Sequence, residues 1–396
     1  MTHPPRTNHG ADMKALWEHH HAMHRQPQDV VVQWKSASDI DPSLFEHRAT
    51  RNWWDVLEST QSTLIVTREY EHLVMALCVQ NGRKRLSYLH LPHPNGLAVD
   101  HQRQIVHVAS TRNPNMIFDF APCTGSVKEG SHALPESRGV LLPKQARYLP
   151  GSTYVHDLAI IKGKLYANSV GSNSVIEVQR DGRFVPVWWP QCIDHPTAPR
   201  FDKNYLQLNS IAPGPTLKDS YFSASTSMPS VRRPGHLNFP VDGCGVIFSG
   251  RTREPVCNGL TRPHSARLHD GALWVDNSGY GEVGRVVDGR FESVVKLPGW
   301  TRGLAFHGDV AFVASSRVIP KYRHYAPGVD CDKSVCGLHA IDVKKAKVLA
   351  SIHWPAGNQM FAIELVDRNM TCGFPFVMSH AHSAAKVRDL FSFGIT

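Results

Sequence analysis

A short sequence pattern recurs along the chain and constrains its fold more than any other feature. In each copy a polar residue is followed by any residue, an apolar residue and usually alanine, and a strand-like run continues from there. Five good copies start at Asn95, His156, Asn209, His264 and Arg302. The copies lie 38 to 61 residues apart, which indicates an architecture of repeated supersecondary units.

Each unit has the pattern of a four-stranded meander. Three further apolar runs follow the copy at His156, namely LYANSV (165–170), VIEVQ (175–179) and FVPVW (184–188). Runs separated by glycine-containing turns predict antiparallel hairpins. A weaker copy at Phe361 completes six units, and we predict an all-β fold, a six-bladed β-propeller. Its closing blade takes its outer strands from residues 60–92. A pair of β-sandwiches is the competing architecture, but it gives no reason for the repeated pattern.

The repeat also sets the domain boundaries. We expect a propeller over residues 53–380, an N-terminal arm over 1–52 and a C-terminal tail over 381–396. The arm is rich in histidine, with His3, His9, His19, His20 and His21. Its segment 11–25 favours a short helix.

Composition argues against several classes of function. The net charge is +9, but the basic residues are scattered, so nucleic-acid binding is not expected. No window approaches ~18 consecutive apolar residues, so a membrane-spanning helix is not expected either. The start of the chain has no apolar stretch for a signal peptide, which favours a cytoplasmic location. Cys331 and Cys336 are the only close cysteine pair, and we expect them to remain thiols there.

The repeated polar position locates a candidate site. The first strand of each propeller blade lines the central channel, so residues at this position face one another around the axis. A packed core would place apolar side chains there, whereas five of the six copies begin with a polar residue. A dedicated site in the channel is one interpretation, and a water-filled channel with a polar lining is the other.

His156 and His264, with Asn209 between them, form a candidate metal site. Two imidazoles and an amide oxygen that converge on one axis can hold a divalent ion such as Zn, Mn or Fe. The same two histidines could instead act as general acid and base, because imidazole titrates near neutral pH.

Arg302 points to an anionic substrate. A guanidinium binds a carboxylate or phosphate through two hydrogen bonds, whereas its charge would repel a bare metal ion. With His156 and His264 it completes the predicted catalytic set, and it also belongs to the predicted substrate-binding set of Asn95, Tyr154, Asn209 and Arg302. For Asp157 we favour a turn-forming role over one that orients His156.

Several segments resemble a bacterial family of conserved hypothetical proteins, catalogued as a domain of unknown function. The most specific are HSARLHDGALW (264–274) and RGLAFHGD (302–309), and the likeness covers roughly residues 53–376. The resemblance implies a propeller and implies that His156, Asn209, His264 and Arg302 match the family's motif positions; it supplies no activity. The chain is more loosely similar to six-bladed lactonase, lyase and NHL-type propellers, some of which hold a metal on the channel axis; this analogy concerns the fold alone.

Two functions follow from these features. The first is a metal-assisted enzyme, a lyase, hydrolase or related tailoring enzyme, that acts on a small anionic molecule or peptide carboxylate in the channel. The second is a non-catalytic propeller that binds a protein or another ligand. Exposed aromatic residues would favour the second function. The pairs Trp53-Trp54 and Trp188-Trp189 are candidates for such a surface, although core packing explains them more simply.

Overall fold

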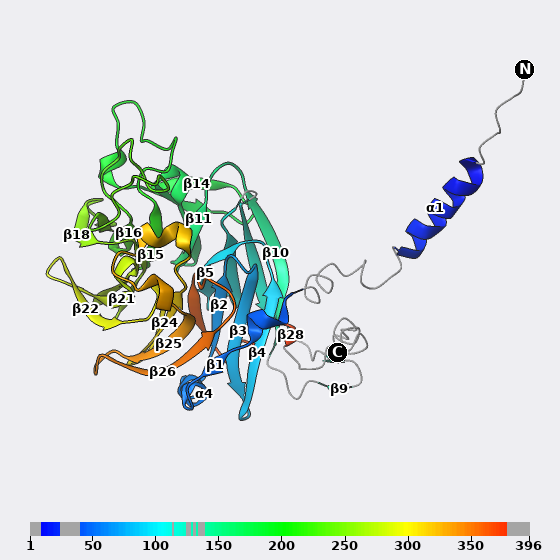
Figure 1. The fold of residues 1–396 in the computed structure, drawn as a ribbon. Coiled ribbons are helices and arrows are strands. Elements are labelled where there is room, and N and C mark those ends of the chain that lie inside the picture. The colour runs from blue at the N-terminus through cyan, green and yellow to red at the C-terminus, as the bar shows by residue number, and fades with distance from the viewer. Residues whose placement is uncertain are drawn as a thin grey trace, which may run out of the picture.

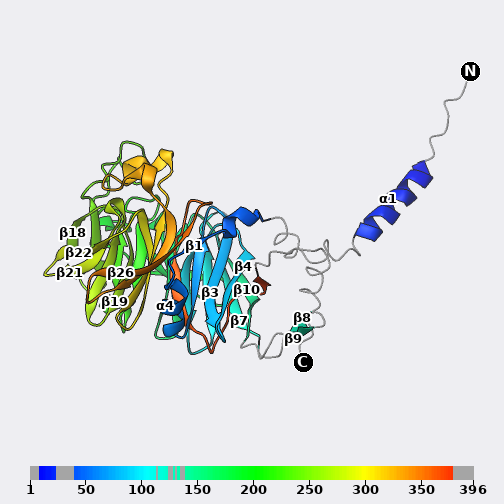
Figure 2. The same ribbon diagram turned by 60° about the horizontal axis from the view of Figure 1, so that its bottom comes forward.

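The computed structural model describes residues 9–23, 40–112, 115–123, 128–129, 132–133 and 139–377. Six antiparallel sheets follow one another around a central axis, as the predicted six-bladed β-propeller requires (Figures 1 and 2). The innermost strands contact one another in a closed circle, in the order β5, β11, β15, β19, β23 and β27. The fold prediction is therefore confirmed, and the β-sandwich alternative is wrong.

Four blades are consecutive four-stranded meanders, apart from one insertion. Blade 2 contains β5 (Pro94–Asp100), β6 (Ile105–Ser110), β7 (Asn115–Pro122) and β10 (Leu141–Leu149). Blade 3 contains β11 (Val155–Ile161), β12 (Lys164–Ser169), β13 (Ser174–Val178) and β14 (Phe184–Trp188). Blade 4 contains β15 (Leu208–Ala212), β16 (Tyr221–Ala224), β17 (Gly245–Ser249) and β18 (Pro255–Leu260). Blade 5 contains β19 (Pro263–His269), β20 (Ala272–Asn277), β21 (Glu282–Val287) and β22 (Arg290–Lys296). The insertion between β7 and β10 carries the short hairpin β8 (Lys128–Glu129) and β9 (His132–Ala133).

The other two blades close the ring. Blade 1 has the order β27 (Ile363–Asp367), β2 (Ser62–Arg68), β3 (Leu73–Gln80), β4 (Arg83–His90) and β28 (Phe376–Val377). Blade 6 has the order β23 (Trp300–His307), β24 (Val310–Ser316), β25 (Cys336–Asp342), β26 (Lys347–Trp354) and β1 (Arg48–Ala49). The C-terminal strand β27 thus lies innermost in blade 1 and pairs with β2. As predicted, residues 60–92 provide outer strands of the closing blade.

Hairpin turns between the inner two strands of several blades follow from their sequences. Lys162 and Gly163 both adopt positive φ angles of 50° and 71°, and Asp270 and Gly271 do the same at 47° and 73°. Two consecutive residues with positive φ form the type I′ turn, whose twist matches that of antiparallel strands.

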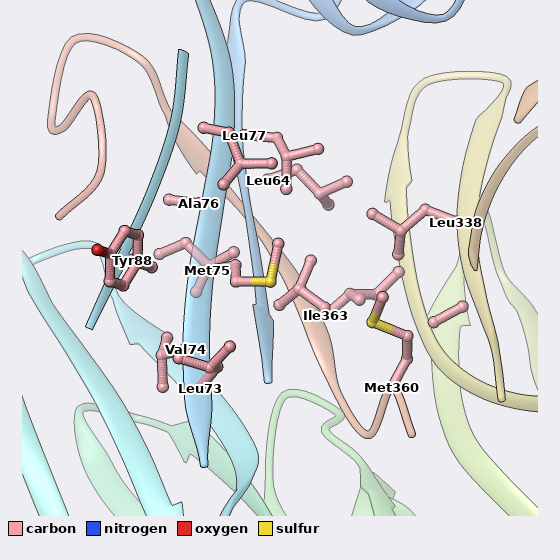
Figure 3. Packing of buried hydrophobic residues seen from close by; sticks show 14 of the residues in the cluster. Leu64, Leu73, Val74, Met75, Ala76, Leu77, Tyr88, Leu338, Met360 and Ile363 are labelled. Atoms are coloured by element: carbon pink, nitrogen blue, oxygen red, sulfur yellow. The ribbon is translucent and has the colours of Figure 1, made fainter. Parts of the chain in front are cut away.

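The largest hydrophobic cluster packs blade 1 against neighbouring blades and against helix α4 (Trp53–Ser59) (Figure 3). Residues 73–79 of β3 are all buried, because both faces of the strand are covered. Trp53 and Trp54 belong to this cluster, and Trp188 is buried against Phe222 with ring centroids 3.9 Å apart. These three tryptophans are core residues, so the simpler interpretation of the pairs as core packing is correct for them.

The helical elements are few and short. The predicted helix of the arm is present as α1 (His9–Met23), which contains His19, His20 and His21. The 3-10 helices are η1 (Pro42–Phe45), η2 (Val170–Ser172), η3 (Gln191–Ile193), η4 (Leu217–Asp219), η5 (Ser278–Tyr280), η6 (Pro320–Tyr325) and η7 (Cys331–Lys333).

Within the part of the chain that the structure describes, no helix has the length and apolar character that a membrane crossing requires. Cys331 and Cys336 are free thiols. His3 and the tail over 381–396 lie outside the described residues.

Candidate active site in the channel

The residues at the repeated polar position meet in the channel. The ring centroids of His156 and His264 lie 6.3 Å apart, and both imidazoles pack edge-on against Phe361 at 5.4 and 5.1 Å. The guanidinium carbon of Arg302 lies 4.9 Å from the Phe361 ring centroid. We call the six repeat positions the channel ring: Asn95, His156, Asn209, His264, Arg302 and Phe361.

Asn95 and Asn209 tie neighbouring blades together and so position the two histidines. The side-chain amide of Asn95 donates to the carbonyl of Val155, and that of Asn209 donates to the carbonyl of Pro263 at 2.9 Å. Each carbonyl belongs to the residue just before a channel histidine. The Oδ1 atoms of both asparagines are buried and have no partner among the described residues.

His156 and His264 are neutral at physiological pH. Burial, reinforced by the charge of Arg302, lowers the pKa of His156 to about 3 and the pKa of His264 well below its usual value. His264 Nδ1 lies 3.1 Å from the hydroxyl of Ser265, whereas His264 Nε2 and His156 Nδ1 bond no described residue. Each imidazole therefore keeps one buried ring nitrogen without a hydrogen bond of ordinary geometry to the described residues.

Arg302 and Arg262 place two buried positive charges beside the histidines. Both arginines are only 6% exposed. Neither guanidinium makes an ion pair with a carboxylate of the described residues. The Arg302 guanidinium lies 4.3 Å from the Trp300 ring centroid, and that of Arg262 lies 4.5 Å from Tyr325. Burial, followed by repulsion from Arg302, lowers the pKa of Arg262 to about 10. Buried charges without a counterion are costly, which favours an anionic ligand between them.

Two glutamines hold these guanidiniums in place. Arg262 donates to the Oε1 atom of Gln207 at 2.6 Å. The side-chain amide of Gln359 is oriented so that it satisfies both of its neighbours. Its oxygen accepts a hydrogen bond from Arg302 at 2.7 Å, and its nitrogen donates one to Glu69 at 3.1 Å. Glu69 is therefore linked to Arg302 only through an amide, and its carboxylate pairs instead with Arg112 at 3.3 Å.

A cavity of about 410 Å³ opens over the channel ring, on the face where the inner strands begin. Its floor includes His156, Arg302 and Phe361, and Tyr154 stands at its rim, 40% exposed. Four further aromatic or basic residues complete much of its wall: Tyr70, Arg112, Tyr322 and Tyr325. The cavity is thus rich in aromatic and cationic side chains, and Glu69 contributes the one carboxylate among its described lining residues.

A second ring of residues lies two positions before each member of the channel ring. This rim ring consists of His93, Tyr154, Gln207, Arg262, Trp300 and Gln359. All of these except His93 line the cavity. Four of them have positive φ angles: His93 at 42°, Tyr154 at 45°, Gln207 at 49° and Arg262 at 54°. Non-glycine residues adopt this conformation at a cost and persist in it mainly where the surroundings enforce it, often at binding sites.

Sequence reasoning found Tyr154 but missed the rest of the rim ring. The signal was present, because the rim ring has the same period as the channel ring with a constant offset of two residues. Asp276 was also missed: it lies opposite His264 on the neighbouring strand and is fully buried. Burial raises its pKa well above the usual value.

The predicted metal ligands fit a divalent ion in donor type. His156 Nδ1, His264 Nε2 and Asn209 Oδ1 are buried and unpartnered within the described residues, and neutral imidazole is the form that binds metal. The described residues contain no group of three or more His, Cys, Asp or Glu side chains that could hold a metal. An ion would therefore need the amide oxygen as well, and it would meet the opposing charges of Arg302 and Arg262.

A charged bridge crosses the channel beyond the two histidines. Arg267 of blade 5 donates to Asp157 of blade 3 at 3.1 Å and to Glu364 of blade 1 at 3.3 Å. Asp157 also accepts from the backbone N–H groups of Leu158 and Ile211, each at 3.0 Å. Asp157 therefore bridges blades, and the expectation of a simple turn-forming role was too narrow.

The comparisons with known proteins agree with this fold. The family model described as a domain of unknown function (DUF4915) matches residues 51–373. No curated protein matches the chain. A solved nidogen–laminin complex contains a chain that is 11% identical with a TM-score of 0.51, covering 77% of this chain and 99% of that one. A gluconolactonase from Xanthomonas campestris is 12% identical with a TM-score of 0.42, covering 67% and 77%. At 11% identity the nidogen–laminin match concerns the fold alone, and no argument rests on the gluconolactonase match.

Proposed function

Because this chain belongs to the DUF4915 family, a domain of unknown function, we propose its activity from the cavity itself: it is an enzyme that acts on a small anionic molecule or peptide carboxylate. One observation carries the proposal. Two buried guanidiniums, those of Arg262 and Arg302, have no ion pair with a carboxylate of the described residues and line one cavity together with the neutral imidazole of His156. His264 packs beside His156 just outside this lining. A cytoplasmic location belongs to the same proposal and fits the free thiols of Cys331 and Cys336.

Arg302 and Arg262 bind the anionic group of the substrate. Their planar guanidiniums are already oriented by stacking on Trp300 and Tyr325, so little side-chain freedom is lost on binding. The substrate anion supplies the counter-charge that the described residues lack, and a desolvated pair of this kind is stronger than one in water.

His156 has two alternative roles, of which the first needs no metal: its Nδ1 accepts a proton from the bound substrate or from water. The free imidazole is a weak base because Arg302 opposes its protonation. A bound anion offsets that charge and raises the pKa, so the base becomes stronger when substrate is present. Proton abstraction serves a lyase, and activation of water serves a hydrolase.

His156, His264 and Asn209 are the residues that would hold a divalent ion such as Zn, Mn or Fe. The ion would polarise a carbonyl or phosphoryl oxygen of the substrate. Arg302 keeps the anionic group of the substrate oriented, and the interblade bond from Asn209 to Pro263 keeps His264 in place.

Metal content of the full chain tests the metal part of this proposal. We expect the double variant His156→Ala/His264→Ala to lose about one equivalent of bound metal by mass spectrometry, relative to the parent protein. The histidine-rich arm is unchanged in both, and a His19→Ala/His20→Ala/His21→Ala variant measures its contribution. If the double variant retains as much metal as the parent, the metal role is wrong and the acid–base role takes its place.

Anion binding tests the substrate part. Titration calorimetry with a panel of small carboxylates should show about tenfold weaker binding by Arg302→Lys, because an ammonium cannot form the two parallel hydrogen bonds. Arg290→Lys, on the exposed strand β22, serves as the matched control. Equal affinities for the parent and Arg302→Lys would show that the anion binds elsewhere.

A non-catalytic binding function is the second candidate. The connection over 225–244 exposes Met228, Val231 and Leu237, which are 74%, 90% and 82% exposed, and the same connection contributes to the cavity wall. Exposed apolar side chains on one loop are typical of a surface that binds a partner. Anion binding that does not depend on His156 or His264, together with no turnover, would favour this function.

A further inference from the structure

A second cavity, of about 560 Å³, lies between blades 2 and 3 on the opposite face of the propeller. It is lined by Asp100 at the end of β5 and by Gly163 in the β11–β12 turn. The channel cavity opens where the inner strands begin, whereas this one opens where they end. The two cavities are therefore separate, and the proposed activity of the channel does not involve the second one.

A buried histidine–aspartate pair lies in the wall of this cavity. His107 Nδ1 is 2.6 Å from Asp119 Oδ1, and Arg147 donates to the same oxygen. All three side chains are buried, on the adjacent strands β6, β7 and β10. Because a carboxylate only accepts, Nδ1 carries the proton and Nε2 is left as an acceptor. Nε2 of His107 bonds no described residue, although His107 lines the cavity.

The cavity also has a surplus of positive charge. Its carboxylates are already engaged within the protein: Asp100 by Arg103 at 3.1 Å, Glu177 by Lys164 at 3.0 Å, and Asp119 by Arg147. Lys144 and Arg180 also line it, and neither side chain pairs with a carboxylate of the described residues.

Lys144 reaches the cavity from an irregularity in blade 2. The pairing of β10 with β7 shifts between Pro143 and Gln145, so Lys144 is the extra residue of a β-bulge. Bulges re-aim side chains and are over-represented beside functional sites. The bulge, on the outermost strand of blade 2, accounts for how the Lys144 side chain comes to line the cavity.

We infer that this second cavity binds a small hydroxylated phosphomonoester, such as a sugar phosphate. Lys144 and Arg180 bind the phosphate, which takes the place of the missing carboxylates. A ligand hydroxyl donates to Nε2 of His107, whose tautomer is fixed by Asp119. The phosphate would thus pair with the two cations that have no carboxylate partner, and the hydroxyl would pair with the acceptor nitrogen of His107.

Titration calorimetry of the full chain with glucose 6-phosphate tests this inference. We expect the double variant Lys144→Gln/Arg180→Gln to bind at least tenfold more weakly than the parent. The matched control is Arg290→Gln/Lys296→Gln, which changes two exposed residues of β22 and should bind like the parent. All four substituted side chains are exposed, and thermal unfolding checks that each variant keeps its fold.

Two outcomes would overturn the inference. Glucose 6-phosphate also has an anionic group that could enter the channel cavity, so Arg302→Lys is measured in parallel. If Arg302→Lys weakens binding and Lys144→Gln/Arg180→Gln does not, the ligand occupies the channel. If inorganic phosphate binds the parent as tightly as glucose 6-phosphate, the hydroxyl contact with His107 is wrong. We expect inorganic phosphate to bind about tenfold more weakly, and His107→Gln to reduce this difference.

Discussion

At the scale of single residues, the channel is defined by charges that the protein leaves uncompensated. Arg302 and Arg262 both lower the pKa of the two channel histidines, and Arg302 also lowers the pKa of Arg262. The structure tolerates this arrangement because the guanidiniums stack on aromatic rings and donate to amide oxygens. A ligand anion would therefore be attracted to both guanidiniums, and its negative charge would also reduce the repulsion between them.

Removal of the Arg302 charge should be visible in the histidines themselves. Burial is the largest cause of the low pKa of His156, and the charge of Arg302 is the second. In Arg302→Gln we therefore expect the pKa of His156 to rise from about 3, while remaining below 6.5 because the ring stays buried. Imidazole chemical shifts followed by NMR as the pH is varied provide the measurement. Arg285→Gln, on β21, is the control, and an unchanged His156 pKa in Arg302→Gln would show that the charge of Arg302 does not contribute to lowering it.

At the scale of the strand, the repeat predicted what every blade shares and missed what single blades add. The copies at His156 and His264 identified inner strands because each blade repeats the same contacts. The edge strands β1 and β28 are two residues long, too short for any alternation of polar and apolar residues. The rim ring was missed because its residue types vary and only its offset is constant, as Gln207 and Trp300 illustrate.

Leu77 of β3 tests the contribution of a fully covered strand. Its side chain is completely buried in the cluster of blade 1, next to Leu64 on β2 (Figure 3). Leu77→Ala leaves a cavity, and we expect a loss of about 2–5 kcal/mol in the free energy of unfolding. Urea denaturation followed by fluorescence provides the measurement. Val185→Ala on β14, where the side chain is 47% exposed, should cost far less, and similar losses for both variants would contradict this account of the core.

At the scale of the whole molecule, contacts across the axis join blades that are distant in sequence. β27 closes the ring against β2, and Arg267 connects Asp157 with Glu364 across the channel. The sequence predicted the closing strand from the weak copy at Phe361. It could not predict the bridge, because no pattern along the chain shows which charged residues of blades 1, 3 and 5 face one another.

The bridge makes the stability of the ring depend on pH through Glu364. Burial raises the pKa of Glu364 in the folded protein to about 7, from 4.5 in an exposed glutamate. The folded state thus holds this proton more tightly than the unfolded state does. The resulting stabilisation is fully present below about pH 4.5 and is lost as the pH rises through 7. A shift of this size corresponds to a change on the order of 3 kcal/mol in the free energy of unfolding.

Glu364→Gln should remove this part of the pH dependence. The amide cannot ionise, and its oxygen still accepts a hydrogen bond from Arg267. Relative to the parent, the variant should be about equally stable at pH 4.5 and more stable at pH 8, as measured by urea denaturation at each pH. Glu292→Gln, an exposed substitution on β22, should keep the pH profile of the parent. A parent protein whose stability rises between pH 5 and 8 relative to Glu364→Gln would mean that the ionised carboxylate gains more from Arg267 than it loses by burial.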